Sequence, residues 1–172
     1  MLLGLGKRRE FDQVVRAFSG DMYRFAYWLC GDRFVAEDVV QEAFARAWRN
    51  WEQLRDKSAP KPWLLTILRH EHARLYERKR LEMVDADPED LAIAADDNPL
   101  EMLELEQVID RLPLSLREPF LLQTLGGFSC AEIAAQLETT EGAVMVRLTR
   151  ARQALRGILA GATGDTRRGG TR

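Results

Sequence analysis

The stretch Ser129–Leu155, SCAEIAAQLETTEGAVMVRLTRARQAL, decides the fold of the C-terminal part of this chain. Ser129 followed by Glu132 forms a capping box, which predicts a short helix that continues through Leu137. A brief turn then leads to Thr140, a second N-cap residue, and to a longer helix rich in arginine. A short helix, a tight turn and a longer basic helix predict a helix-turn-helix. This pattern by itself leaves one alternative open, a plain helical hairpin with a basic exterior.

The longer helix of this motif has two chemically different sides. Residues at helical spacing, among them Val144, Leu148 and Leu155, lie along the side that would face a core. The opposite side fits the major groove of DNA, because its N-terminal part can approach base edges while arginines reach phosphates or guanines. The candidate DNA-binding residues of this motif are Thr140, Gly142, Val146, Arg147, Thr149, Arg150 and Gln153.

The residues before the motif extend the helical pattern into a small domain. Apolar spacing predicts a helix over residues 100–112, ended by Pro113, and a second over 116–125, closed by two glycines. We therefore expect a C-terminal domain over residues 100–160 and a disordered tail over 161–172. Residues 81–99 are acidic, contain prolines and lack a sustained period, which indicates a flexible linker.

Charge is distributed unevenly along the 172 residues of the chain. Residues 1–80 carry a net charge of +5, residues 81–110 of −11 and residues 111–172 of +4. Two mildly basic lobes therefore flank an acidic connector, although the whole chain has a net charge of only −2. Basic lobes are suited to an anionic polymer such as DNA, though a modest excess of charge is weak evidence.

Composition also excludes several classes of protein. Hydrophobic residues make up 46% of the chain, which is typical of globular domains. No apolar run approaches the roughly 20 residues that span a bilayer, and the N-terminal MLLGLGKRRE has its basic residues after its apolar ones, unlike a secretory signal. We expect a cytoplasmic protein without direct membrane insertion. Cys30 and Cys130 are far apart and lack a metal-ligand pattern, so no metal, cofactor or disulfide is expected.

Residues 1–80 predict three helices. The first is expected over Glu10–Leu29, with an interruption at Ser19 and Gly20, and Gly31 then ends it. The second contains AEDVVQEAFARAW (36–48) and is amphipathic, with acidic residues near its start that suit the positive end of the helix dipole. Its periodicity alone favours an ordinary solvated outer face. Its expected core side holds Ala36, Val40, Ala43, Phe44, Ala47 and Trp51, and its outer side holds Asp38, Gln41, Glu42, Ala45 and Arg49.

A third helix, WLLTILRHEHARLYERKR (63–80), follows a loop in which Ser58 is the expected N-cap. Arg69, His72, Tyr76 and Arg80 are expected to share its outer face, with Lys79 at the edge. An aromatic ring among cations suits single-stranded nucleic acid, and the alternative is a solvated basic helix end. The sequence HEH at 70–72 lacks the spacing of a metal site. The expected core side holds Trp63, Leu64, Ile67, Leu68 and Leu75.

Three stretches in this order resemble an extracytoplasmic-function sigma factor of bacterial RNA polymerase. AEDVVQEAFARAW is similar to the clamp-binding helix of the promoter-melting domain, and PWLLTILRHEHARLYERKR (62–80) to its promoter-reading helix. LPLSLREPFLLQTLGGFSCAEIAAQLETTEGAVMVRLTRARQAL (112–155) is similar to the C-terminal promoter-binding domain. The resemblance covers nearly everything from Phe11 to Leu159. It implies an all-α, two-domain, non-enzymatic protein that binds core polymerase, recognises minus-thirty-five and minus-ten promoter elements and promotes DNA melting.

The resemblance also implies roles for matching residues. The outer face of the second helix, with Asp38, Gln41 and Glu42, would contact the clamp helices of the largest polymerase subunit. The helix that follows Thr140 would read the minus-thirty-five duplex, the flap of the second subunit would be a further contact, and the acidic connector would thread polymerase channels. An anti-sigma protein is a candidate partner. Near the melted minus-ten element, where a base flips into a protein pocket, would lie the loop before Trp63 and Arg69, His70, His72, Tyr76, Lys79 and Arg80.

The chain departs from the family pattern at positions close to DNA. The promoter-reading helix has His70 and Arg74 where the family commonly has asparagine and an acid, and the recognition helix has Met145 and Val146 where lysine and serine are common. These changes favour apolar contacts to thymine methyl groups or readout of DNA shape. Two rival functions are a stand-alone helix-turn-helix regulator, which leaves residues 1–80 unexplained, and a nuclease that binds a divalent ion through Glu37, Asp38 and Glu42.

Overall fold

The computed structural model of the chain describes residues 2–82 and 104–165. These residues form seven α-helices and one short 3-10 helix, and no strand occurs among them. The chain divides into two compact units, residues 1–97 and 98–172, each considered by itself below. The expected all-α fold class with two helical domains is therefore confirmed.

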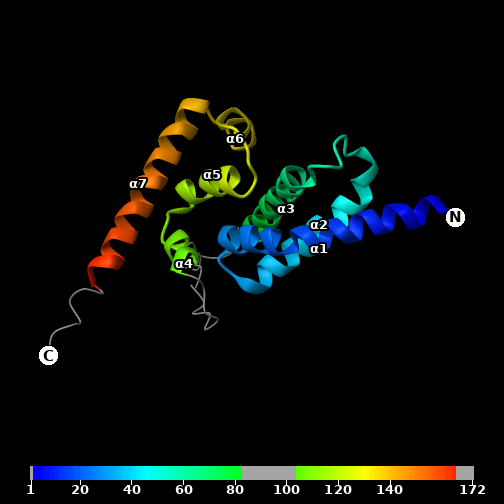
Figure 1. Cartoon of the computed structure of the whole chain (residues 1–172), viewed down its shortest axis with the longest axis horizontal. Coiled ribbons are helices and arrows are strands. Elements are labelled where there is room, and N and C mark those ends of the chain that lie inside the picture. The colour runs from blue at the N-terminus through cyan, green and yellow to red at the C-terminus, as the bar shows by residue number, and fades with distance from the viewer. Residues whose placement is uncertain (1, 83–103, 166–172) are drawn as a thin grey trace. The chain divides into compact units, whose positions relative to one another are not determined.

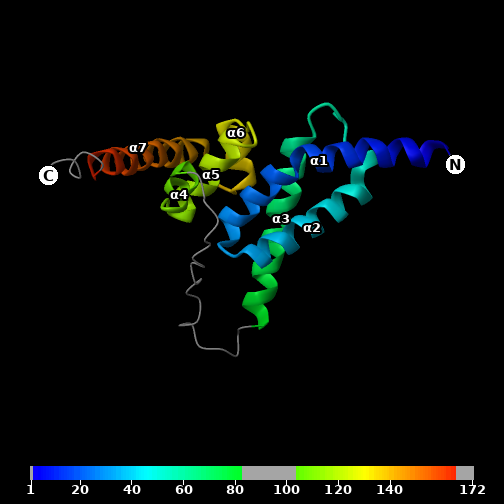
Figure 2. The same cartoon turned by 60° about the horizontal axis from the view of Figure 1, so that its bottom comes forward.

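The first unit contains α1 (Leu2–Cys30), α2 (Arg33–Asn50), η1 (Trp51–Gln53) and α3 (Pro60–Glu82), and Figures 1 and 2 show its three long helices packed together. The expected interruption of α1 at Ser19 and Gly20 was wrong, because the helix is continuous there. A glycine costs a helix only about 1 kcal/mol relative to alanine. Burial of Phe11, Met22 and Phe25 on both sides of Gly20 anchors α1 and outweighs that cost.

The link between α1 and α2 follows the expected helix stop and start. Gly31 has a positive φ of 67° and its N–H donates to the carbonyl of Tyr27 over 2.8 Å, which ends α1. Asp32 is the N-cap of α2, and its side chain accepts from the N–H of Val35 over 2.9 Å. A two-residue connection of this kind holds consecutive helices as antiparallel neighbours.

The core of the first unit is built around α2. Val39 is buried in place of the expected Val40, while Val40 and Phe44 are half-buried. Helix α2 packs against both α1 and α3, so apolar residues cover a wide arc of its surface. The prediction from the sequence assumed one narrow apolar stripe and therefore misplaced the middle of the buried side. Ser58 does not cap α3, because the helix begins at Pro60 and the residue before it is Ala59; the N–H and hydroxyl of Ser58 both donate to Asp56. The remaining buried residues of α2 are Ala36, Ala43 and Ala47, and the core of α3 holds Leu64, Leu65, Ile67 and Leu68.

The second unit contains α4 (Glu104–Asp110), α5 (Leu114–Thr124), α6 (Cys130–Gln136) and α7 (Glu141–Asp165). Its fully buried side chains are contributed by the segment after α4 and by the other three helices. Helix α7 continues through residues 161–165, which the sequence placed in a disordered tail, and the start of the helix expected from residue 100 lies outside the described residues. The core residues are Leu112, Leu121, Leu122, Ile133, Val144 and Leu148.

Candidate polymerase and nucleic-acid interfaces

The helix-turn-helix expected from the sequence is formed by α6 and α7. Ser129 and Glu132 make the complete capping box: the Ser129 hydroxyl accepts from the Glu132 N–H over 3.3 Å, and the Glu132 carboxylate accepts from the Ser129 N–H over 2.8 Å. The Ser129 N–H, and secondly the Ser129 hydroxyl, donate to the Glu132 carboxylate and lower the pKa of Glu132 below its ordinary value. The Thr140 hydroxyl accepts from the N–H of Ala143 over 3.2 Å and so caps α7 as expected.

The turn of this motif closes through a residue with a left-handed backbone. Glu138 has φ of 50°, and the next N–H, that of Thr139, donates to the carbonyl of Ala134 over 3.0 Å. This geometry satisfies the carbonyl groups at the end of α6 and turns the chain directly into α7. The local hydrogen bonds therefore fix where the basic helix begins.

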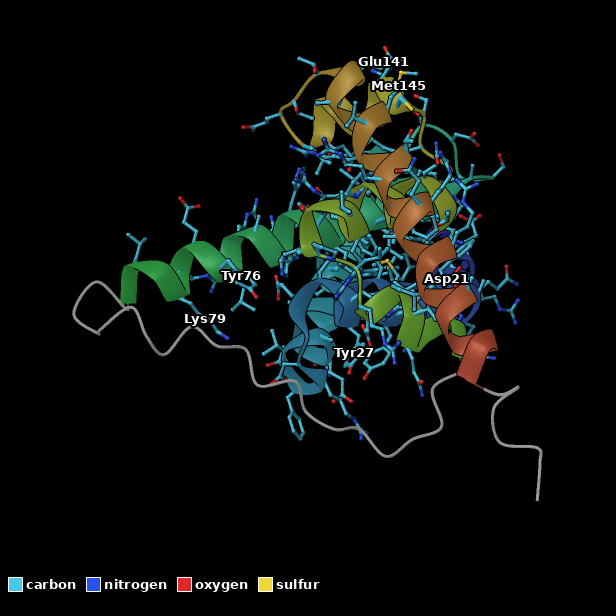
Figure 3. All side chains as sticks on the ribbon, turned by 90° about the vertical axis from the view of Figure 1, so that its left-hand side faces the viewer. Asp21, Tyr27, Tyr76, Lys79, Glu141 and Met145 are labelled. Carbon is cyan, nitrogen blue, oxygen red and sulfur yellow. The ribbon has the colours of Figure 1, made fainter. Side chains whose placement is uncertain are left out.

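The candidate DNA-binding residues lie together along α7. In the first two turns of this helix, two exposed residues were not among the candidates, Glu141 and Met145, and Figure 3 labels both. The exposed fraction of Met145 is 56%, so the apolar side chain that departs from the family pattern is open to outside contacts. Thr140, Gly142, Val146, Thr149, Arg150 and Gln153 are exposed, and Arg147 is half-exposed.

The candidate polymerase-binding residues also share one face. Asp38, Gln41 and Glu42 are all exposed on the side of α2 away from its buried alanines. Glu42 forms an ion pair with Arg49 two turns later over 2.9 Å. Within the described ranges, Asp38 and Gln41 have no side-chain hydrogen bond or ion pair, so this face offers an uncompensated carboxylate and an amide to a partner.

The candidate minus-ten residues on α3 do not form one exposed face. His70 and Lys79 are exposed and Arg69 is half-buried, whereas the side chain of Arg80 lies outside the described residues. The rings of His72 and Tyr76 are both half-buried, and their centroids are 4.6 Å apart. The expectation that they lie on the outer face was therefore wrong.

Tyr76 and Lys79 instead lie near the C-terminal end of α1. Figure 3 shows both on one side of the C-terminal half of α3. Burial raises the pKa of the Tyr76 hydroxyl, and the nearby Cys30 thiol adds to the effect. Burial also raises the pKa of Cys30 to about 12, against the opposing charge of Lys79. The periodicity of α3 could not predict that Tyr76 is half-buried, because α1 packs against a side of α3 whose residues are mostly polar.

The exposed face of α3 contains two arginines that were not among the candidate minus-ten residues. Arg74 and Arg78 are exposed and lie one and two turns after His70, on the same side of the helix. In the sequence, only the four-residue spacing of His70, Arg74 and Arg78 indicates that they share a face. This spacing is hard to recognise among the many charged residues from 69 to 80. The exposed basic face of α3 is thus formed by His70, Arg74 and Arg78, with Lys79 at its edge.

Glu71 is a buried acid between α2 and α3 whose position the sequence reasoning missed. Its exposed fraction is 3%, and it forms an ion pair with Arg46 of α2 and another, over 3.1 Å, with Arg74. A buried carboxylate needs such partners, because desolvation of an isolated charge is costly. Glu71 lies at the helical spacing of Leu64 and Leu68, and this spacing is the feature of the sequence that indicates its burial.

A pocket of about 370 Å³ lies between the N-terminal half of α1 and the loop before α3. Phe18 contributes aromatic surface to it, whereas Trp51 lines it with an exposed fraction of only 1%. Lys57 and Ser58 contribute polar groups from the loop. The Lys57 ammonium lies 5.4 Å from the Trp51 ring centroid. In the part of the chain that the structure describes, no cluster of three or more acids, histidines and cysteines could hold a metal ion, and no helix is both long and apolar enough to span a bilayer.

Comparison with known proteins identifies the family. The family model described as Sigma-70 region 2 matches residues 14–82, and that described as Sigma-70, region 4 matches residues 102–155. The ECF RNA polymerase sigma factor SigE of Mycolicibacterium smegmatis is 32% identical over 166 residues, which cover 91% of this chain and 64% of SigE. The ECF RNA polymerase sigma factor EcfG of Rhodopseudomonas palustris is 34% identical over 140 residues, covering 78% of this chain and 77% of EcfG.

A solved structure agrees with these relatives. The sigma factor RpoE from Bartonella quintana, in complex with the anti-sigma factor NepR, shares 28% sequence identity with a TM-score of 0.67, covering 88% of this chain and 98% of that chain. The match to region 2 accounts for the N-terminal helices, which a stand-alone helix-turn-helix regulator leaves unexplained. The chain therefore belongs to the extracytoplasmic-function family of RNA polymerase sigma factors, which are non-enzymatic proteins of promoter recognition.

Proposed function

We propose that this sigma factor binds core RNA polymerase in the cytoplasm through the outer face of α2. The observation that carries the proposal is the set of Asp38, Gln41 and Glu42, exposed together on a helix whose other side is core. An acidic, hydrogen-bonding face of this kind complements a basic surface such as polymerase clamp helices would offer. Because α2 is held between α1 and α3, the face is presented by a rigid element.

Reversal of charge on this face tests the proposal. The double substitution Asp38→Lys and Glu42→Lys should weaken the affinity for core polymerase at least about tenfold, because like charges would then meet across the interface. The measurement is an equilibrium titration of labelled protein with core enzyme at two salt concentrations. Asp12→Lys, which reverses an exposed carboxylate on α1, is the matched control and should bind normally. Equal affinities for the wild type and the double variant would contradict this interface.

We further propose that α3 meets the melted minus-ten element through the face of His70, Arg74 and Arg78, with Lys79 at the edge and Arg69 beside it. Two exposed arginines one turn apart suit a phosphate backbone. His72 and Tyr76 then act mainly by packing, since both rings are half-buried. The pocket beside Phe18 is the candidate for the flipped base, because this half-buried aromatic ring can offer a surface for base stacking. Arg80 remains a predicted contact.

The second unit supplies the duplex contacts in this proposal. The exposed side of α7 follows a fully capped turn, and its arginines can bind phosphates while residues nearer the N-terminus approach bases. The flap of the second polymerase subunit and an anti-sigma protein are further proposed partners. The RpoE structure, solved with the anti-sigma factor NepR, supports the latter.

A further inference from the structure

Two apolar side chains occupy the exposed side of the helix that is proposed to read duplex DNA. The exposed fractions of Met145 and Val146 are 56% and 49%, although they follow directly on the core residue Val144. Neither is needed for the core, because Val144, Leu148 and Ala151 already fill that side of α7. Neighbouring exposed apolar side chains at the start of a recognition helix indicate a surface that binds a partner.

A third apolar group lies beside them. The hydroxyl of Thr149 donates to the carbonyl of Met145 over 2.9 Å, so it is engaged by the backbone of its own helix. With that proton engaged, the exposed side chain of Thr149 offers outside contacts its methyl group and the acceptor lone pairs of its hydroxyl oxygen. Met145 and Thr149 are four residues apart, about 6 Å along the helix axis, and this distance spans one or two base-pair steps of about 3.4 Å.

The surrounding charges indicate what this apolar surface contacts. Arg147 is half-exposed and Arg150, Arg152 and Arg156 are exposed along the same helix, so the apolar groups lie within a basic surface. Such a surface fits the phosphate backbone on either side of a groove. Within the major groove, the C5 methyl group of thymine is the apolar feature that base edges present.

We propose that Met145, Val146 and the methyl group of Thr149 read the C5 methyl groups of thymine at adjacent base pairs of the upstream promoter element. This inference rests on the proposed function, in which α7 lies in the major groove of duplex DNA. It assigns sequence specificity to contacts between apolar side chains and the methyl groups of the bases. Met145 was not among the candidate site residues.

Replacing thymine by deoxyuridine tests the inference, since it removes the methyl group and keeps every hydrogen-bonding group of the base. Run-off transcription of a genomic library by core polymerase and the full chain first identifies a promoter. The affinity of the holoenzyme is then measured on duplexes that carry deoxyuridine at one thymine position of the upstream element at a time. For the wild type we expect a loss of about fourfold at one or two adjacent positions, the effect of one buried methyl group.

Variants of the helix distinguish the possible outcomes. Met145→Ala and Val146→Ala should bind the thymine duplex more weakly and lose the discrimination against deoxyuridine at one position each. Both sites are exposed helix positions that alanine fits, so folding is preserved. Leu159→Ala truncates another exposed apolar residue of α7 and should keep the full discrimination. Arg150→Ala should weaken binding to thymine and deoxyuridine duplexes by the same factor.

Failure of the inference differs from failure of the proposed function. If deoxyuridine has no effect at any position while Arg150→Ala weakens binding, α7 binds the duplex and the methyl contacts are wrong. If none of the α7 substitutions changes DNA binding, the proposed role of this helix is wrong as well. If Met145→Ala and Val146→Ala weaken association with core polymerase instead, the surface contacts a protein, which also overturns the inference.

Discussion

Gly126 occupies a position in the second unit where a side chain has no room. A Cβ atom there would lie 2.5 Å from Cδ2 of Phe128 and 2.6 Å from the backbone carbonyl oxygen of Leu122. The same carbonyl accepts from the N–H of Phe128 over 3.3 Å, so the backbone that closes α5 cannot move away without losing that bond. The adjacent Gly127 has φ of 69°, which glycine adopts at little cost.

Gly126→Ala should therefore lower the free energy of unfolding of the second unit by about 2 kcal/mol, the usual cost of forcing extra atoms into a packed site. Urea denaturation followed by circular dichroism measures the change. Gly142→Ala is the matched control: its Cβ would meet nothing within 4 Å, so alanine should stabilise α7 by up to about 1 kcal/mol. The same stability for both variants would show that the turn accommodates a side chain.

At the level of helices, the ion pair between Arg46 of α2 and Glu71 of α3 joins the proposed polymerase-binding element to the proposed promoter-reading element. Glu71 is buried, while the side chain of Arg46 is 34% exposed. Arg46→Ala should cost about 3 kcal/mol of unfolding free energy, because it leaves a carboxylate buried with only the more exposed Arg74 as partner.

A double-mutant cycle with Glu71→Ala checks that prediction by urea denaturation. The double variant should lose clearly less stability than the two single losses added together, since each single change removes the same interaction. Arg33→Ala, which breaks the exposed pair with Glu37, is the control and should cost less than about 1 kcal/mol. Strictly additive losses would mean that Arg46 and Glu71 do not stabilise each other.

The success of the sequence predictions also differs from one element to the next. The helix-turn-helix was predicted because its signals are local: the capping box at Ser129, the Thr140 cap and the glycine pair each act within a few residues. The partial burial of His72 and Tyr76 depends on where α1 lies against α3, and no periodicity within α3 contains that information. The exposed acids of α2 were identified, but their role as an interface came from the family resemblance and remains a proposal.

For the whole molecule, the two units have separate hydrophobic cores. Leu64 is fully buried in the first unit, where α3 meets α1 and α2. Leu148 is equally buried in the second unit, where α7 packs against α5 and α6. A sigma factor in which separate units bind two promoter elements needs each unit to be stable by itself, and domains with their own cores generally unfold by themselves.

Leu64→Ala and Leu148→Ala should consequently each lower one of two calorimetric unfolding transitions and leave the other unchanged. Removal of a buried leucine side chain costs about 2–5 kcal/mol, which is enough to shift the melting temperature of a small domain by roughly 10 °C or more. The two variants control for each other, because the chemical change is the same and only the core differs. If both variants lowered a single shared transition, the chain would unfold as one cooperative unit, and independent placement of the two promoter-binding units would have to be abandoned.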